Sequence, residues 1–243
     1  MNWLRWALLA AFSLAAAVPL RAEPAAKTRT PNLRVEWFLA EEDPDDDRIV
    51  GPPDVIADCS ERLRRLGVEH RSAPIALRQK RSGTYMCGNE QTVLYRSGPE
   101  RIRYNAAPLV GCGLALALAH FEHLVQEEAE LLFMRRVRRI EQGGTYNCRR
   151  MTRFQHLVSE HSYANAIDVR AFVLEDGRRI SVRQHFGRLD REPATPQAKF
   201  LRRLARRLYD ERVFSVVLTP YWDALHRDHF HLDMARYRVD GTR

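Results

Sequence analysis

Residues 159–182 read SEHSYANAIDVRAFVLEDGRRISV, and this stretch contains a clear strand-turn-strand pattern. Residues 166–174 are rich in β-branched and aromatic side chains, which favour a strand. The turn sequence Glu-Asp-Gly (175–177) follows, and residues 180–182 predict a second short strand after it. The stretch therefore predicts a hairpin within an antiparallel sheet.

Helical patterns lie on both sides of this hairpin. Residues 112–134 predict the longest helix of the chain, because their apolar residues recur at helical spacing. These apolar residues are Leu114, Leu118, Phe121, Leu124, Val125, Leu131 and Leu132. Residues 200–209 predict a second helix. Residues 59–66 predict a short one that ends at Gly67.

Further strands complete the expected sheet. The turn sequence Ser-Gly-Pro (97–99) predicts a hairpin between residues 93–95 and 101–104. Three more strands are expected at residues 137–140, 213–218 and 230–234. Together with the helices, these strands predict an α+β fold, in which an antiparallel sheet has helices packed on it.

The N-terminal part of the 243-residue chain differs in composition from the rest. Residues 1–22 contain an apolar run preceded by a basic residue, which is typical of a signal peptide; an uncleaved N-terminal anchor is the alternative. Residues 23–53 mix Pro and Lys with an acidic run, and we expect a linker or arm. We expect the folded domain at 54–236 and a C-terminal tail at 237–243, with no membrane span once the signal is removed.

A signal peptide implies a periplasmic or secreted protein, and an oxidising compartment favours disulfides between an even number of cysteines. The four cysteines are Cys59, Cys87, Cys112 and Cys148. Three pairings are possible, and we favour Cys59 with Cys87 and Cys112 with Cys148. A zinc site built from all four is the competing interpretation, but the chain has no Cys-x-x-Cys pair.

The charge balance is basic. Lys and Arg outnumber Asp and Glu by 39 to 31, a formal charge of +8, which falls to about +6 when the two arginines of residues 1–22 are removed. The excess favours an anionic partner. For an exported protein, an anionic wall polymer or lipid headgroups are better candidates than nucleic acid. A solvated basic surface is the simpler alternative, and the composition does not indicate an oligomeric state.

Two segments concentrate side chains that can bind a metal. His161 and Asp168 lie in the first quoted stretch, and His229 and His231 lie two residues apart on an expected strand, where both rings point to one face. An ionised Asp168 in an apolar strand is costly unless a cation is near. His161, Asp168 and His231 with a water would make an open tetrahedral zinc site, although iron, cobalt or nickel also accept such ligands. An ion pair of Asp168 with an arginine, and a surface or capping role for His161, are the alternatives.

Four motifs carry a resemblance to a known family. They are S-E-H-x-x-x-N-A-I-D-V-x-x-F from residue 159, D-G-R-x-I-S-V from 176, F-L-R-R from 200 and H-x-D-H-F-H-L-D-x-A from 226. These motifs resemble the bacterial extensin-like C-terminal domain, which is similar to the hedgehog-type D-Ala-D-Ala metallopeptidases. The resemblance runs from about residue 54 to 235 and is dense after residue 146. It implies a hedgehog/DD-peptidase-like zinc fold.

The resemblance also implies roles for individual residues. It implies that one zinc ion is bound by His161, Asp168 and His231. His229 falls on a non-ligand position beside the metal, and His226 matches a histidine that lines the cleft in the murein endopeptidase branch. In related carboxypeptidases the general base is a Glu three residues before the last ligand, where this chain has Asp228. The catalytic base is therefore His229 or Asp228.

Two further positions bear on the resemblance. Arg149 lies in a segment, residues 146–150, that resembles the one whose arginine holds a substrate carboxylate or carbonyl in the carboxypeptidases. A guanidinium suits this task because it is permanently charged and binds in a bidentate way; a surface arginine is the alternative. Ala164 departs from the family, since many relatives carry Gly there, and this affects the loop next to His161.

These features predict a zinc peptidase of DD or LD type that acts on peptidoglycan stem peptides or cross-links. The alternatives are a non-catalytic, zinc-stabilised wall-binding protein and a metal-free structural envelope protein. The complete ligand set and the additional His229 favour an enzyme. The sequence contains no Ser-His-Asp arrangement, phosphate loop or Cys-x-x-Cys redox motif that would support another chemistry.

Overall fold

The computed structural model describes residues 51–80 and 84–243. The expected signal peptide (1–22) and all but the last three residues of the expected linker (23–53) lie outside the described residues. Within the described ranges, no helix combines the length and apolar character needed to cross a membrane.

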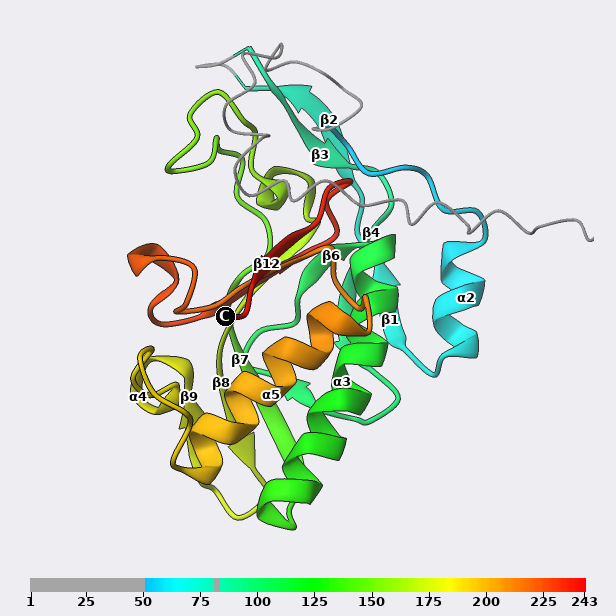
Figure 1. Ribbon diagram of the computed structural model, residues 1–243. Coiled ribbons are helices and arrows are strands. Elements are labelled where there is room, and N and C mark those ends of the chain that lie inside the picture. Colours follow the sequence, from blue (N-terminus) through cyan, green and yellow to red (C-terminus); the bar gives the residue numbers. More distant parts are fainter. Residues whose placement is uncertain (1–50, 81–83) are drawn as a thin grey trace, which may run out of the picture. The chain divides into compact units, whose positions relative to one another are not determined.

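Six strands follow the first described helix in succession, and the later helices and strands are interspersed (Figure 1). The α-helices are α2 (Cys59–Arg65), α3 (Cys112–Phe133), α4 (Val182–His185) and α5 (Pro196–Asp210), and the two 3₁₀ helices are η1 (Glu160–Tyr163) and η2 (Ala224–His226). The strands of the largest sheet are β5 (Arg103–Tyr104), β7 (Val137–Gly144), β8 (Ala166–Leu174), β9 (Arg179–Ser181), β10 (Val216–Leu218), β11 (Phe230–Asp233) and β12 (Val239–Gly241). Two smaller sheets contain β1 (Glu69–Ser72), β4 (Thr92–Ser97) and β6 (Leu109–Gly111), and β2 (Ile75–Gln79) and β3 (Met86–Asn89).

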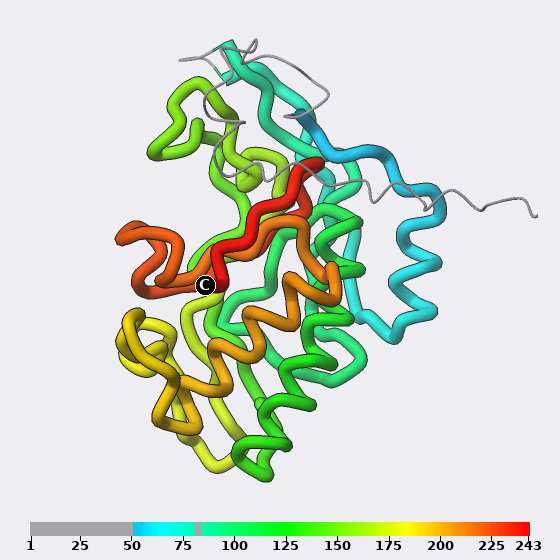
Figure 2. The backbone as a smooth tube through the Cα atoms, in the orientation of Figure 1, coloured from blue at the N-terminus to red at the C-terminus, as the bar shows by residue number. Residues whose placement is uncertain are grey.

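The largest sheet has the strand order β12-β10-β11-β8-β7-β5, and β9 pairs with β8. Its pairs are antiparallel except β5 with β7 and β10 with β12, which are parallel. The α+β class is therefore confirmed, whereas the sheet is mixed rather than purely antiparallel. Residues 237–243, expected as a tail, contain β12, which runs beside β10 at the end of the chain (Figure 2).

The two predicted hairpins have different outcomes. β8 and β9 pair antiparallel as predicted, and Gly177 turns the chain with a φ of 88°, which Gly adopts without steric cost. The hairpin around residues 97–99 is wrong, because β4 pairs with β1 and β6 while β5 pairs with β7. The side chain of Asn105, just after β5, accepts a hydrogen bond from the Gln142 amide at 2.8 Å and donates one to the Gln142 carbonyl at 3.1 Å, and both bonds hold this segment against β7.

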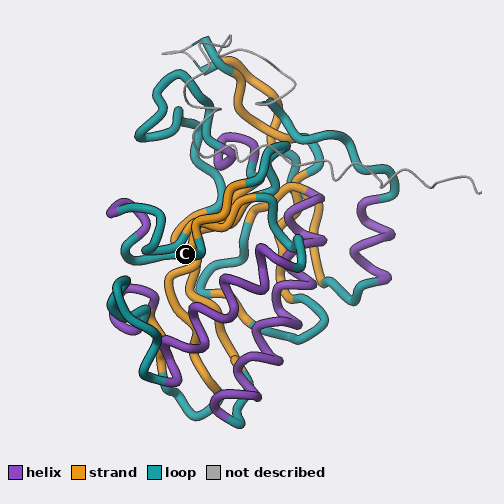
Figure 3. The backbone as a smooth tube through the Cα atoms, viewed as in Figure 1, coloured by secondary structure: helices purple, strands orange, loops and turns teal. Residues whose placement is uncertain are grey.

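Helices α3 and α5 pack side by side on one face of the largest sheet (Figure 3). Strand residues alternate between this helix-covered core and the opposite face. The core residues of β8 and β11, all fully buried, are Ile167, Val169, Phe172, Leu174, Phe230 and Leu232. The apolar stripe of α3 is confirmed along most of its length, but Leu131 is 64% exposed because it lies off the face that carries Leu118, Phe121 and Val125.

The disulfides join Cys59 to Cys112 and Cys87 to Cys148, so the pairing favoured from the sequence is wrong. Cys59 begins α2 and Cys112 begins α3, two helices that contact each other, and the Cα atoms of this pair are 6.0 Å apart. Cys87 lies on β3, with its Cα atom 5.7 Å from that of Cys148. Both distances suit a disulfide. The packing of elements that are distant in sequence decides the pairing.

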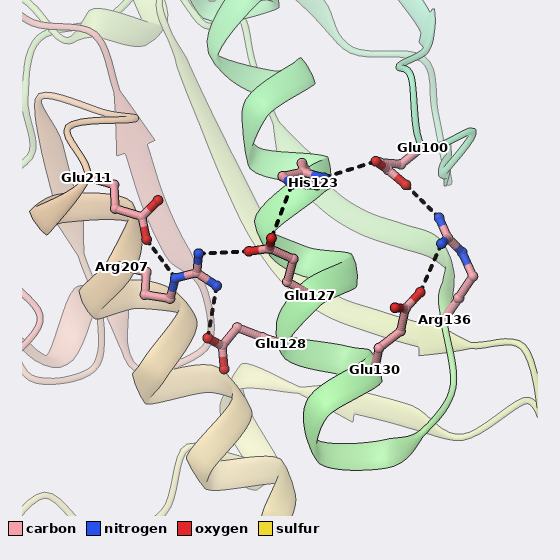
Figure 4. Close-up of polar contacts among 8 residues, drawn as sticks. All are labelled: Glu100, His123, Glu127, Glu128, Glu130, Arg136, Arg207 and Glu211. Carbon is pink, nitrogen blue, oxygen red and sulfur yellow. Dashed lines mark hydrogen bonds and ion pairs between the residues drawn. The ribbon is translucent and has the colours of Figure 1, made fainter.

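An ion-pair network connects α5 with α3 (Figure 4). The guanidinium of Arg207 on α5 lies 2.8 Å from Glu127 and 3.1 Å from Glu128, both on α3, and 2.7 Å from Glu211. The network continues along α3 and beyond it through His123, Glu100, Arg136 and Glu130. These contacts join α3 and α5 on the helix-covered face of the sheet. The candidate site lies on the other face.

Candidate metal centre

Two of the predicted ligands are direct neighbours across the sheet. β8 and β11 pair antiparallel with Asp168 opposite His231. Both side chains point away from α3 and α5, since the residues on either side of each are buried in the helix-covered core. The alternation of apolar and polar residues in the two strands therefore places both groups on the open face of the sheet.

His161 reaches the same place from η1, which directly precedes β8. The helix ends at Ala164, whose φ of 52° and ψ of 32° are in the left-handed region. A residue with a Cβ pays an energetic cost in this conformation, whereas Gly would adopt it without strain. The turn reverses the chain and brings the His161 ring back over β8, with its centroid 5.1 Å from that of His231.

The ligand atoms of the three residues converge. Nε2 of His161 lies 3.3 Å from Oδ1 of Asp168, and Nδ1 of His231 lies 3.2 Å from the same oxygen. All three ligand atoms lie within 4.8 Å of one another. Tetrahedral zinc with bonds of about 2.0–2.2 Å separates its ligand atoms by roughly 3.3–3.6 Å. The two distances to Asp168 are close to this range, and two imidazoles with a carboxylate are a donor set that zinc accepts.

One buried atom supports this fit. His161 is 3% exposed, and its Nε2 makes no hydrogen bond of good geometry with any described residue. Buried polar atoms are rarely left without a partner, and those that are require an explanation. A metal ion between Nε2 and Asp168 would supply the missing interaction.

Outer hydrogen bonds orient both imidazoles. Nδ1 of His161 donates to the carbonyl of Thr145 at 3.3 Å, and Nε2 of His231 donates to the carboxylate of Asp233 at 2.9 Å. Each bond leaves the other ring nitrogen directed at Asp168. Such partners fix the tautomer of a metal-binding histidine and raise its basicity.

The charged groups at the centre shift one another's pKa values. Burial would raise the pKa of the Asp168 carboxyl, but the neighbouring imidazoles of His161 and His231 hold that pKa far below its usual range. Burial would likewise lower the pKa of His231, but Asp168 and Asp233 raise it to about 10. The cluster is thus built around one ionised carboxylate that attracts positive charge.

His229 and Asp228 form a pair beside this centre. Nε2 of His229 lies 3.6 Å from Oδ1 of Asp168, and its Nδ1 donates to Oδ1 of Asp228 at 2.9 Å. This contact with His229 lowers the pKa of Asp228. Both candidates for the catalytic base are therefore present, and Asp228 is placed to orient His229.

His226 lies next to the same cluster. Its ring centroid is 5.3 Å from that of His229 and 5.9 Å from that of His231. Burial and the neighbouring His231 lower the pKa of His226 to about 4, although Asp223 accepts a hydrogen bond from its Nδ1 at 2.7 Å. His226 is therefore a neutral, oriented imidazole at the edge of the centre.

A cavity of about 290 Å³ opens beside these residues. Arg149 lines it, and its guanidinium donates to the carbonyl of Arg150 at 3.2 Å. The other predicted residues that line the cavity are Asp168, His226, His229 and His231. Asp228 is not among the lining residues and reaches the centre through His229.

The sequence analysis missed three acidic residues of this region. They are Glu160, Asp223 and Asp233, and all three line the cavity. Burial and the charge of Asp233 raise the pKa of Glu160 to about 8. Asp233 could have been found, because it lies two residues after His231 and so shares its face of the strand. Asp223 gives no comparable signal, since a turn positions it.

Comparison with known proteins places the chain in one family. Residues 57–242 match the family model described as Extensin-like protein C-terminus, which covers most of the chain. No curated protein and no solved structure matches the chain. The likeness to hedgehog-type metallopeptidases thus stays a prediction. The chain belongs to the extensin-like protein C-terminus family.

Proposed function

We propose that this protein is a zinc-dependent peptidase that acts on peptidoglycan stem peptides or cross-links. The observation that carries the proposal is the convergence of His161, Asp168 and His231 beside a cavity that also contains His229. A closed structural zinc site uses four protein ligands, whereas three ligands next to a cavity leave a position for water and substrate.

The chain's own residues supply the proton transfers in this proposal. When bound, zinc would acidify a water and polarise the scissile carbonyl. His229 takes the proton of the attacking water at Nε2, because Asp228 engages its Nδ1 and keeps Nε2 directed toward Asp168. His229 then gives that proton to the leaving amine. Asp228 is thus the orienting group, and His229 the base.

Arg149 is the proposed substrate anchor. It lines the cavity, and the polar lining also includes Arg153. A guanidinium there would hold a carboxylate of the peptide. The formal charge of +8, or about +6 without residues 1–22, supports an anionic wall substrate, and the two disulfides support a location in the periplasm or outside the cell.

Metal content tests the zinc centre. The wild-type protein, supplied with zinc and desalted, should retain one zinc ion per chain by mass spectrometry, whereas His161→Ala and His231→Ala should retain little. His229→Ala is the matched control, because it removes an imidazole beside the centre that is not a proposed ligand. If the wild-type protein retained no zinc after this treatment, the proposal would be contradicted.

Hydrolysis of peptidoglycan fragments then tests the reaction. His229→Ala should keep its zinc and lose at least about 100-fold in turnover, as expected for loss of a general base. Retained turnover in this variant would make Asp228 the base. The alternative function is wall binding without cleavage. It is favoured by Asp228, whose side chain is one methylene shorter than that of the Glu that serves as base in related carboxypeptidases. This function would be indicated if zinc-loaded wild-type protein bound the fragments and cut none of them.

A further inference from the structure

We infer that the β10–β12 side of the cavity is an apolar subsite that takes a small aliphatic side chain of the substrate, next to the scissile bond. This inference rests on the proposed function, because it assumes that substrate binds at the candidate metal centre. It adds a specificity determinant, centred on Leu218 and Trp222, to the polar residues already described.

The register of the sheet places this subsite beside the centre. Asp168 on β8 lies opposite His231 on β11, and His231 lies opposite Leu218 on β10. The three residues therefore form one row across neighbouring strands. Adjacent strands are about 4.7–4.9 Å apart, so the Leu218 side chain begins one strand spacing from a proposed zinc ligand.

The subsite has its own apolar cluster on the open face of the sheet. Val216 and Val239 are buried there, at 3% and 7% exposure, and Leu218, Trp222 and Tyr237 pack against them as partly buried residues. This cluster is separate from the helix-covered core, to which the intervening Val217 of β10 belongs. All five side chains of the cluster named here also line the cavity.

The rest of the lining is mixed. It includes the cations Arg149 and Arg153, the acidic Glu160, Asp223 and Asp233, and the apolar Met151, Phe154 and Leu225. Arg153 forms an ion pair with Asp223 at 3.4 Å. A peptide bound across the metal centre can place its carboxylate against Arg149 and its side chain against Leu218 and Trp222. Water leaves the apolar wall on binding, which favours an aliphatic group over a charged one.

The volume limits the size of that group. A cavity of about 290 Å³ is at the lower end of the roughly 300–1,000 Å³ typical of ligand pockets. The metal-centre polar groups and the anchoring arginines share this space with the subsite. A side chain of a few carbons fits the remaining volume better than an aromatic ring.

Alkyl hydroxamates test the subsite by binding rather than by activity. The hydroxamate group binds zinc, and the alkyl chain reports the neighbouring wall. Isothermal titration of zinc-loaded protein gives the ratio of the acetohydroxamate Kd to the butyrohydroxamate Kd. Two buried methylenes should make this ratio roughly 15-fold in the wild type. The ratio cancels any change in zinc binding itself.

Leu218→Ser should reduce this ratio several-fold, because it replaces the wall next to the centre with a polar group. Trp222→Ser is a second variant outside the strand, for use if Leu218→Ser does not fold. Leu131→Ser is the matched control, since Leu131 is exposed on α3 and does not line the cavity. It should keep the wild-type ratio.

The outcomes separate the subsite from the proposed function. Zinc-loaded wild-type protein with a ratio near one would overturn the subsite, as would a wild-type ratio in both subsite variants. Either result leaves the peptidase proposal intact. A high ratio that the variants abolish supports the subsite even if no peptide is cut. Wild-type protein that retains no zinc overturns both proposals.

Discussion

Glu122 on α3 has none of its surface exposed, and it lies away from the candidate metal centre. Its Oε1 accepts hydrogen bonds from the hydroxyls of Tyr95 at 3.0 Å and Tyr104 at 3.2 Å. Burial raises the pKa of this carboxyl to about 7, and the hydrogen bonds only partly oppose the effect of burial. Because the unfolded chain has a carboxyl pKa of 4.5, the folded protein binds this proton more tightly.

The sign of the effect on stability follows. Glu122 contributes fully to folding below pH 4.5, and this contribution is lost as the pH rises through about 7. The loss is on the order of 3 kcal/mol of unfolding free energy. Glu122→Gln, which cannot ionise, should show a smaller fall in stability between pH 4.5 and pH 8 than the wild type. Urea unfolding at both pH values measures the difference.

Glu175→Gln is the control for this experiment, because Glu175 is exposed. It should keep the pH dependence of the wild type. If Glu122→Gln and the wild type lose stability equally between the two pH values, ionisation of Glu122 is not coupled to folding.

Individual residues differ in how well the sequence predicts them. The period-two pattern of β8 and β11 is enough to place Asp168 and His231 on one face, and the structure brings His161 to within 3.3 Å of Asp168. That this group binds zinc stays a prediction. The hydrogen-bond partners Thr145 and Asp223 could not be predicted, because turns that depend on the whole fold position them.

Glu128 is the residue of α3 through which this helix is joined to α5. It is 1% exposed, and it accepts hydrogen bonds from Arg203 at 2.8 and 3.2 Å and from Arg207 at 3.1 Å. Both arginines lie on α5, so one buried carboxylate connects the two helices. Figure 4 shows its contact with Arg207. A charge that is buried and paired is costly to leave without its partner.

Glu128→Ala should therefore lower the unfolding free energy by about 1–3 kcal/mol, since it removes charged hydrogen bonds and leaves two cations beside a gap. Glu211→Ala is the matched control, because Glu211 contacts the same Arg207 but its side chain is 40% exposed. That change should cost less than about 0.5 kcal/mol. Chemical denaturation measures both values, and equal losses would show that burial of Glu128 does not matter.

Elements with a long periodic pattern were predicted well. The helix expected at 112–134 is α3, Cys112–Phe133, because its apolar repeat spans several turns. Short elements were predicted less well: the strand expected at 213–218 is only Val216–Leu218. The hairpin expected around residues 97–99 failed because local turn chemistry does not specify which neighbour a strand pairs with, and Asn105 directs β5 to β7.

At the scale of the whole molecule, the two disulfides connect segments that no local pattern relates. Cys59 and Cys112 are 53 residues apart, and Cys87 and Cys148 are 61 apart, so the two closed loops overlap along the chain. Four cysteines allow three pairings, and sequence spacing does not choose among them. The fold chooses, by packing α2 against α3 and β3 near residue 148.

The similar loop lengths make the two disulfides a matched pair for a last prediction. Chain entropy predicts that removing either lowers the unfolding free energy by about 2–4 kcal/mol. Cys148 is close in sequence to groups that bond to His161 directly: the Asn147 amide donates to the His161 carbonyl at 3.0 Å, and the Thr145 carbonyl accepts from its Nδ1. Next to Cys112, the Gly111 amide donates to the carbonyl of Ala164 at 2.8 Å, and so contacts η1 without bonding to His161 itself. Cys148 also adjoins Arg149 at the cavity.

The double variant Cys87→Ser/Cys148→Ser should therefore lose zinc affinity as well as stability, by about tenfold, the lower end of the effect of disturbing the outer hydrogen bonds of a metal site. Cys59→Ser/Cys112→Ser should lose similar stability and keep its zinc affinity. Urea unfolding and titration against a chelator measure the two quantities in the folded proteins. Equal zinc affinities in the two variants would mean that η1 holds His161 in place without help from the Cys87–Cys148 disulfide.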